Sequence, residues 1–385
     1  MSGFGPEHLP YGVFRPGGEA ARVGARLGDA ILDLAALAAD GLLPADPELF
    51  AQPSLNAFMA AGPDTWRSVR QALRALVSGP DAQPAAVPLD DVELLLPIEI
   101  GDYVDFYSSL EHASNVGRIF RPDSDPLPPN WRHLPVGYHG RSGTVVVSGT
   151  PIHRPCGQRR DADGAAPVYG PSTRLDIELE LGFVIGVPTE HGEQVPVDRA
   201  LDHVFGVVLL NDWSARDLQA WEYRPLGPFL AKSFATSISA WVTPLDAVLA
   251  RRVRAAAQEP EPLPYLREDP WAFDIDLEVE LDGATVARTN ASHLYWSAAQ
   301  QVAHMTVNGA SLRVGDLFGS GTISGPGRDQ RGSLLELSWN GEEPISLPDG
   351  STRAFLEDGD EVVLRGRAGE GVELGEVRGR IEPAL

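Results

Sequence analysis

The chain has 385 residues, 43% of them hydrophobic and 22% charged, which suits one large folded domain with a smaller one, or two of ordinary size. Its formal net charge of −23 argues against nucleic acid and anionic membrane surfaces as partners, because both repel an acidic protein. The one cysteine, Cys156, excludes an intramolecular disulfide framework and a cysteine-rich zinc site.

The N-terminal residues predict a small β-rich unit. The segments 11–14 and 21–34 indicate short strands, with a hairpin turn at Gly28-Asp29. Apolar residues recur at helical spacing over 64–77, with Asp64 or Thr65 as the expected N-cap. The stretch 78–91 is rich in Pro, Ala and Asp and is the best linker candidate, so we expect one domain over 1–90 and another over 91–385.

Short strands dominate the remainder. We expect them at 144–147, 175–186 and 204–210, near 335 and near 362, and in a hairpin from 275 that turns at Asp282-Gly283. A helix is expected over 293–305. Regular βαβ alternation is missing, so the sequence predicts a mainly β, mixed α+β architecture instead of a doubly wound sheet. The sequence starts without a signal peptide and lacks the ~18-residue apolar run of a membrane-spanning helix, so we expect a cytoplasmic protein.

A pair of carboxylates marks the segment 175–186. Glu178 and Glu180 are two residues apart and point to one face of the expected strand, while the apolar residues between and around them suit a core. Two interpretations stand: a solvated outer face, or a pair whose mutual repulsion a divalent cation relieves. The same alternation recurs at Glu278 and Glu280, so the pattern alone is weak.

Two aspartates raise a related question. Asp212 ends an apolar strand that should be buried on both faces, so its carboxylate needs a turn amide, an arginine such as Arg216, or a metal. Asp105 lies among aromatic residues and needs a partner for the same reason. These residues indicate oxygen ligands for a metal in a soluble enzyme.

Lys232 is the only lysine of the chain, against thirty arginines. A compact ammonium can approach a small anion in a way that a planar guanidinium cannot, so Lys232 is either a surface leftover or a position where arginine would fail. His112 lies in polar surroundings beside Glu111, and is either structural or a catalytic base. The glycine-rich loop 319–327 lacks the dinucleotide-binding spacing and a Gly-Lys-Ser/Thr sequence, which excludes a P-loop.

Five long motifs resemble the fumarylacetoacetase family. They are DYVDFYSSLEHASNVGRIFRP from 102, NWRHLPVGYHGR from 130, NDWSARDLQAWEYRPLGPFLAKSFAT from 211, VNGASLRVGDLFGSGTISGP from 307 and LLELSW from 334. The resemblance covers nearly the whole chain and implies hydrolysis of a carbon–carbon bond of 4-fumarylacetoacetate to fumarate and acetoacetate, the last step of tyrosine and phenylalanine breakdown. The alternatives are a hydrolase or decarboxylase of a related acylpyruvate or dioxo acid, and a ligand-binding protein without turnover.

The resemblance also implies an architecture and a site. It implies an SH3-like N-terminal barrel before a large β-roll catalytic domain, in a homodimer that binds a small-molecule substrate. The implied calcium ligands are Asp105, Glu178, Glu180 and Asp212, and a magnesium ion is implied near Asp212, Lys232 and Thr236. The implied catalytic residues are His112 as general base, Glu336 as its orienting carboxylate, and Arg216, Gln219 and Lys232 at the developing oxyanion. The implied substrate contacts are Tyr107, Arg121, Tyr138, Gln219, Tyr223 and Thr322.

The chain departs from the family pattern at two positions. Ala235 stands where the family has glycine, and alanine would be strained there if the backbone required a positive φ. Leu110 stands where the family tends to have arginine, two residues before His112, which would alter substrate affinity or nothing.

Overall fold

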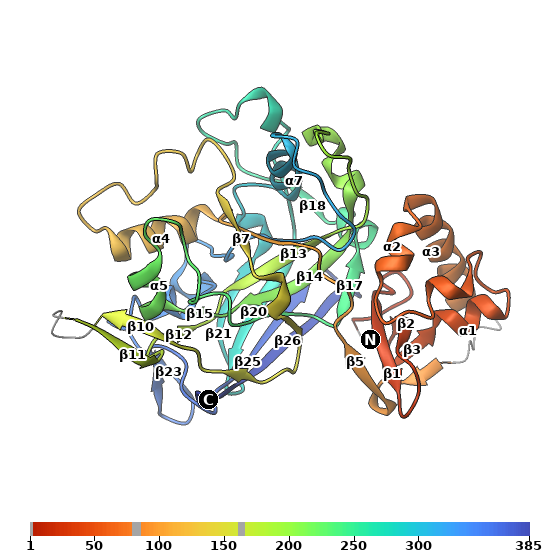
Figure 1. Cartoon of the computed structure of the whole chain (residues 1–385), viewed down its shortest axis with the longest axis horizontal. Helices are drawn as coiled ribbons and strands as arrows, with labels where there is room; N and C mark the ends of the chain where they lie inside the picture. The colour runs from red at the N-terminus through yellow and green to blue at the C-terminus, as the bar shows by residue number, and fades with distance from the viewer. Residues whose placement is uncertain (1–2, 79–85, 161–165) are drawn as a thin grey trace.

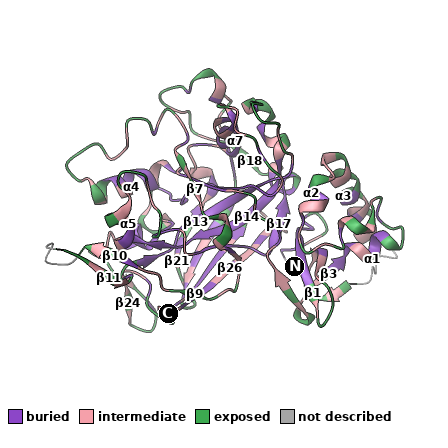
Figure 2. Cartoon of the chain, viewed as in Figure 1, coloured by how far each residue is buried: buried purple, intermediate pink, exposed green. Residues whose placement is uncertain are grey.

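The structure is a computed structural model that describes residues 3–78, 86–160 and 166–385. Figure 1 shows a small N-terminal unit beside a larger, strand-rich body, and Figure 2 shows that the central strands of the larger body are buried. The mainly β, mixed α+β class is therefore confirmed. The α-helices are α1 (Leu34–Ala39), α2 (Asn56–Ala60), α3 (Pro63–Ser78), α4 (Leu110–Phe120), α5 (Arg216–Glu222), α6 (Leu245–Leu249), α7 (Ala298–Thr306) and α8 (Leu334–Leu337).

The N-terminal unit is built of antiparallel β-strands that α1, α2 and α3 cover. Its strands are β1 (Tyr11–Pro16), β2 (Arg22–Leu27), β3 (Ala30–Asp33), β4 (Ala86–Pro88) and β5 (Val92–Leu95). The hairpin at Gly28-Asp29 is confirmed, because Leu27 pairs with Ala30 across it. Helix α3 begins at Pro63, so Asp64 lies in its first turn instead of capping it.

The expected linker is only partly a linker. Residues 79–85 lie outside the described residues, whereas 86–88 form β4 against β3. Strand β5 follows the expected boundary at residue 90 and pairs with β1, and the boundary itself stays a prediction. Strand β1 also pairs with β17 of the larger unit, through Tyr11 with Val242 and Gly12 with Trp241, so one sheet runs through both units.

Two sheets enclose the core of the larger unit. The first continues from β1 in the order β17-β14-β13-β22-β6-β7, with β16 beside β14 and β8 beside β16. Its strands are β6 (Tyr103–Phe106), β7 (Gly137–Gly140), β8 (Val145–Val147), β13 (Leu179–Ile185), β14 (Val204–Asp212), β16 (Thr236–Ile238), β17 (Trp241–Pro244) and β22 (Leu317–Gly319). The second sheet comprises β21 (Ala284–Asn290), β20 (Asp276–Leu281), β25 (Glu361–Arg367), β26 (Glu373–Glu382) and β9 (Ile152–His153), in that order. Between the two sheets, buried aliphatic residues such as Leu209, Leu277 and Leu364 belong to one core cluster.

Short two-stranded pairs complete the fold. They are β10 (Cys156–Arg160) with β11 (Pro167–Pro171), β12 (Leu175–Asp176) with β15 (Ser214–Ala215), β18 (Arg252–Arg254) with β19 (Trp271–Phe273), and β23 (Ile345–Ser346) with β24 (Thr352–Arg353). Within the described ranges, no helix is long and apolar enough to cross a membrane.

Three expectations need correction. The segment near 335 is the helix α8 and not a strand, because Ser333 accepts the Glu336 N–H and a distant carboxylate accepts the N–H groups of the first two helical residues. The expected strand over 175–186 is divided into β12 and β13. The helix expected from 293 begins only at Ala298, where Ser297 and Gln300 form a capping box. The hairpin at Asp282-Gly283 and the strand near 362 are confirmed.

Candidate active site and metal centre

Four buried carboxylates meet where strands of the first sheet lie side by side. Asp105 is on β6, Glu180 on β13 and Asp212 at the end of β14, while Glu178 stands between β12 and β13. One ligand oxygen from each lies within 4.8 Å of the others. Glu178 and Glu180 are only 6% and 0% exposed, so the solvated-face interpretation of this pair is wrong.

Lys232 brings a buried ammonium into this cluster. Its Nζ donates to Glu178 Oε2 and to Asp212 Oδ2, both at 2.6 Å, and the residue is 7% exposed. Thr236, which pairs with Asp212 across β16 and β14, donates its hydroxyl to Asp212 Oδ1 at 2.9 Å. Lys232 is therefore not a surface leftover, and one ammonium faces four acidic groups.

The charges of the cluster are unevenly compensated. Burial raises the pKa of Asp105 well above its usual range, and the nearby Asp212 raises it further. Burial and then Asp105 raise the pKa of Glu180 in the same way. Burial also acts upward on Glu178, but Lys232 and Arg216 outweigh it and lower the pKa of that carboxyl. The cluster therefore lacks positive charge on the Asp105 and Glu180 side.

The same side has unused acceptors and little spare room. Asp105 Oδ1 and Glu180 Oε1 are buried and have no hydrogen-bond partner among the described residues. A Cβ on Gly319 would come within 2.9 Å of Glu180 Oε2. Gly321, whose φ of +77° favours glycine, donates its N–H to the same oxygen at 3.0 Å. Buried oxygens left unpaired in such a set fit a hard divalent cation.

A histidine–glutamate pair lies close to the cluster. His112, on the first turn of α4, contacts Glu336 of α8 through Nδ1 and Oε2 at 2.6 Å. Side-chain donors also fix this carboxylate: Asn115 at 2.9 Å, Ser324 at 2.9 Å and Ser333 at 2.8 Å. A hydrogen bond from Nδ1–H to Glu336 leaves the other ring nitrogen, Nε2, as the one that can accept a proton.

The electrostatics of Glu336 agree with this role. Burial alone would raise its pKa, but His112 and the hydrogen bonds from Asn115 and Ser333 outweigh burial, and the pKa is lowered. Glu336 is thus the ionised partner that holds the ring in place. Glu111, which the sequence suggested as a neighbour, acts on His293, whose pKa burial lowers and Glu111 partly restores.

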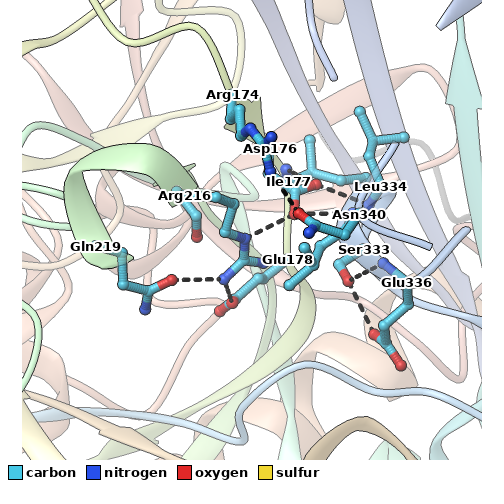
Figure 3. Close-up of polar contacts among 12 residues, drawn as sticks. Arg174, Asp176, Ile177, Glu178, Arg216, Gln219, Ser333, Leu334, Glu336 and Asn340 are labelled. Carbon is cyan, nitrogen blue, oxygen red and sulfur yellow. Dashed lines mark hydrogen bonds and ion pairs between the residues drawn. The ribbon is translucent and has the colours of Figure 1, made fainter. Parts of the chain in front are cut away.

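Arg216 connects Glu178 of the carboxylate cluster to Gln219 and Asp176. Its Nη1 lies 2.8 Å from Glu178 Oε1 and 3.1 Å from Gln219 Oε1, and its Nε donates to Asp176 Oδ2 at 2.7 Å (Figure 3). Its Nη2 is buried without a hydrogen-bond partner in the described part of the chain. Arg216 therefore does not pair with Asp212, and one of its donors is unused.

Of the other residues expected to contact substrate, two meet residues of the site, one has a buried hydroxyl, and two lie just after the ends of helices. The Tyr107 ring meets His112 edge to face at 5.3 Å, and Tyr138 pairs with Asp105 across β7 and β6. Thr322 has a buried hydroxyl that is unpaired within the described ranges. Arg121 is the C-cap residue that follows α4, and it donates to the Pro126 carbonyl at 2.7 Å. Tyr223 is the C-cap residue that follows α5, one turn beyond Gln219, and its backbone N–H donates to the Gln219 backbone carbonyl at 3.0 Å.

Four polar residues of this region escaped the sequence reasoning: Asp176, Asn115, Ser324 and Ser333. Asp176 was readable as the first member of an acidic alternation with Glu178 and Glu180. Asn115 was readable from its spacing of three from His112 on a helix. Ser333 was readable as the N-cap of a helix, because it stands three residues before Glu336. Ser324 lies in a loop and carries no sequence signal.

The Ala235 departure is tolerated. Four non-glycine residues of the described chain have a positive φ, and Ala235 is not one of them. Its side chain is 6% exposed and belongs to the main core cluster. The strain that a positive φ would impose is therefore absent. Leu110 begins α4 and packs against a small core cluster that includes Trp131.

Comparisons with known proteins agree along the whole chain. The model of the fumarylacetoacetate (FAA) hydrolase C-terminal domain matches residues 103–382, and the model of the fumarylacetoacetase N-terminal domain matches residues 7–97. The chain is 48% identical over 411 residues to fumarylacetoacetase of Homo sapiens, covering 100% of this chain and 97% of the human protein. Its identity to fumarylacetoacetase of Caenorhabditis elegans is 48% over 408 residues, covering 100% and 97%.

A solved structure of fumarylacetoacetate hydrolase from Exiguobacterium antarcticum shares the fold. Its TM-score is 0.57 at 18% identity, with 97% of this chain and 99% of that chain covered. At this identity the likeness concerns the fold alone.

Proposed function

Because the chain belongs to the fumarylacetoacetase family, we propose that its buried site carries out that family's reaction with the residues described above. The enzyme is a hydrolase that cleaves a carbon–carbon bond of 4-fumarylacetoacetate and yields fumarate and acetoacetate, in tyrosine and phenylalanine breakdown. The observation that carries the assignment of residues is the pair His112–Glu336 beside a buried carboxylate cluster with unpaired oxygens.

The cluster fits a metal of the calcium or magnesium type. We assign calcium to Asp105, Glu178, Glu180 and Asp212, and magnesium to the neighbourhood of Asp212, Lys232 and Thr236. When bound, such an ion supplies a Lewis acid that holds and polarises the oxygens of a diketone. The two unpaired carboxylate oxygens and the raised pKa values of Asp105 and Glu180 support this assignment.

His112 supplies the base. Its Nε2 takes a proton from water while Glu336 keeps Nδ1–H in place, and the water oxygen adds to the carbonyl carbon beside the double bond. General-base assistance of this kind contributes about 10²–10⁴-fold in rate. The carbonyl electron pair moves to its oxygen, and the resulting tetrahedral centre then breaks its bond to the neighbouring CH₂. That electron pair leaves as the enolate of acetoacetate, which takes a proton from the His112 imidazolium.

Arg216, Gln219 and Lys232 stabilise the oxyanion. The unused Nη2–H of Arg216 is the donor best placed to serve it, because Nε and Nη1 are already engaged. Gln219 accepts from Arg216 through its carbonyl oxygen, which leaves its amide nitrogen as the donating end. One such donor is typically worth about 3–4 kcal/mol in the transition state. We place Tyr107, Arg121, Tyr138, Tyr223 and Thr322 around the rest of the substrate.

The direct test is to mix the purified protein with 4-fumarylacetoacetate and follow loss of the diketone absorbance. Fumarate and acetoacetate should appear in equal amounts. A shorter acylpyruvate, measured in parallel, represents the alternative substrate class and should react much more slowly. Turnover of the shorter acylpyruvate alone, or binding of fumarylacetoacetate without products, would contradict the proposal.

We also propose that the chain forms a homodimer in the cytoplasm, with an SH3-like domain over 1–90 and the catalytic domain over 91–385. The family resemblance supports these statements. Light scattering should give about twice the chain mass of 41.3 kDa. A mass of one chain would contradict the dimer.

A further inference from the structure

A third buried aspartate, Asp176, connects Arg216 to the helix that carries Glu336. Asp176 is the last residue of β12, is 0% exposed, and lies outside the carboxylate cluster. Its Oδ1 accepts the N–H groups of Ile177 at 2.8 Å and Leu334 at 2.7 Å. Its Oδ2 accepts Arg216 Nε–H at 2.7 Å and the Leu335 N–H at 3.1 Å. Both oxygens are therefore fully used by the protein, and Asp176 does not act on substrate itself.

One end of this arrangement fixes Arg216. Asp176 engages Nε, while Glu178 Oε1 and Gln219 Oε1 engage Nη1, so contacts on two edges determine where the planar guanidinium lies (Figure 3). The remaining donor, Nη2, is the buried group without a partner in the described chain. Without Asp176 the plane could rotate about its contacts at Nη1, and Nη2 would lose its direction.

The other end fixes the general-base pair. Leu334 and Leu335 are the first two residues of the four-residue helix α8, and Glu336 is the third. Their N–H groups lie in the first turn, where the helix itself offers no acceptor, and would otherwise need other partners. By accepting both, Asp176 anchors the backbone that carries the Glu336 carboxylate, which lies 2.6 Å from His112 Nδ1.

We propose that Asp176 is a positioning residue that sets the placement of the oxyanion donor Arg216 relative to the His112–Glu336 pair. The inference rests on the proposed function, because it assigns Asp176 a role in the geometry of that reaction. Because one carboxylate contacts both Arg216 and the backbone of α8, the oxyanion donor and the general-base pair keep a fixed position relative to each other during the reaction. Asparagine cannot replace it, because an amide nitrogen would face N–H donors and leave at least one of them unpaired in the core.

The test compares Asp176→Asn with the matched control Asp217→Asn. Asp217 is the neighbouring carboxylate on α5, and it accepts from Ser172 and Thr173 without contacting the Arg216 guanidinium or α8. We expect Asp176→Asn to lower kcat by about 10²-fold with KM changed less than about threefold, the size seen when an oxyanion donor is lost. The control should keep kcat within about threefold of the wild type on the same scale.

A double-mutant cycle separates positioning from general destabilisation. In an Arg216→Gln background, adding Asp176→Asn should cost at least about tenfold less in kcat than it costs in the wild type, because groups that act as a unit are not additive. Losses that simply multiply, or a fully active Asp176→Asn enzyme, would overturn the proposal. Asp176→Glu keeps the charge but shifts it by one methylene, so a folded Asp176→Glu protein should also lose kcat.

If both Asp176 variants fail to fold, Asp176 is a structural residue and the positioning role is refuted. The wild-type enzyme is measured in the same assay throughout. Absence of turnover in the wild type would instead refute the proposed function, so the two failures are distinguishable.

Discussion

Removal of the Lys232 ammonium tests the electrostatics of the cluster. In Lys232→Met, the oxygens of Glu178 and Asp212 lose a donor that lies 2.6 Å from each. The side chains of Lys232 and Glu178 are each 7% exposed and that of Asp212 is 0% exposed, so water cannot replace the lost ammonium. Breaking a buried ion pair by removing one side typically costs about 3–5 kcal/mol. We expect a loss of that size in the free energy of unfolding of the metal-free protein at pH 7.

The pH dependence of this loss has a defined sign. Burial raises the pKa of Asp212 even beside Lys232, and the variant loses that ammonium, so the Asp212 carboxylate destabilises the folded state once the pH exceeds the unfolded pKa. The penalty fades as the pH falls and the carboxylate takes up a proton. The cost of Lys232→Met should therefore be smaller at pH 5 than at pH 7, measured by urea unfolding with a chelator present.

A surface ion pair provides the control. Arg288 lies 2.8 Å from Glu278, and their side chains are 71% and 28% exposed. Arg288→Met should cost about 0–1 kcal/mol, because exposed pairs are solvated and screened. If Lys232→Met costs no more than Arg288→Met, the reasoning about an undercompensated buried cluster is wrong.

Three further predictions concern the base, the acid stability and the metal. Glu336→Gln should lower kcat by about 10²–10⁴-fold while calcium still binds in calorimetric titration, and unchanged kcat would remove Glu336 from the mechanism. Burial lowers the pKa of His8, whose ring contacts Thr243 at 3.0 Å, to about 3, so its contribution to stability is complete above about pH 6.5 and declines toward pH 3. Unfolding of His8→Gln should show a shallower loss between pH 7 and pH 4.5 than the wild type, and equal slopes would contradict this. Because burial raises the pKa of Asp105 and of Glu180, calcium binding at pH 7 should release protons, seen as binding heats that depend on the ionisation enthalpy of the buffer; buffer-independent heats would contradict it.

The sequence predicted the local elements well where a pattern has one physical solution. The run over 204–210 is apolar at every position, and the structure buries all of β14. The turn at Asp282-Gly283 follows from residues that tolerate a positive φ, and both have one. In such segments the local preference and the final environment agree.

Other features depend on what packs against a segment, which a single sequence does not reveal. Glu178 and Glu180 share their alternation with Glu278 and Glu280, yet the second pair binds Arg288 and Arg365 at a partly open sheet face. The first pair is buried beneath neighbouring strands. Only the tertiary arrangement distinguishes a solvated face from a metal centre.

The candidate site shows the same limit. His112 and Glu336 are 224 residues apart, and spacing alone gave no reason to pair them; the family resemblance did. Helix α8 was expected to be a strand because its four apolar-rich residues lack a helical period. Its helical conformation follows from its contacts with Ser333 and with Asp176, and Asp176 is 158 residues away from Leu334 in the sequence.

The most direct test of the account measures fumarylacetoacetate turnover by the wild type and by His112→Asn, each before chelation, after chelation, and after Ca²⁺ or Mg²⁺ is restored. We predict rapid turnover by the wild type that chelation stops and the cation restores, and none by His112→Asn in any condition although it binds the cation. Wild-type turnover that is indifferent to chelation, or an active His112→Asn enzyme, would contradict the assignment of the carboxylate cluster or of the base.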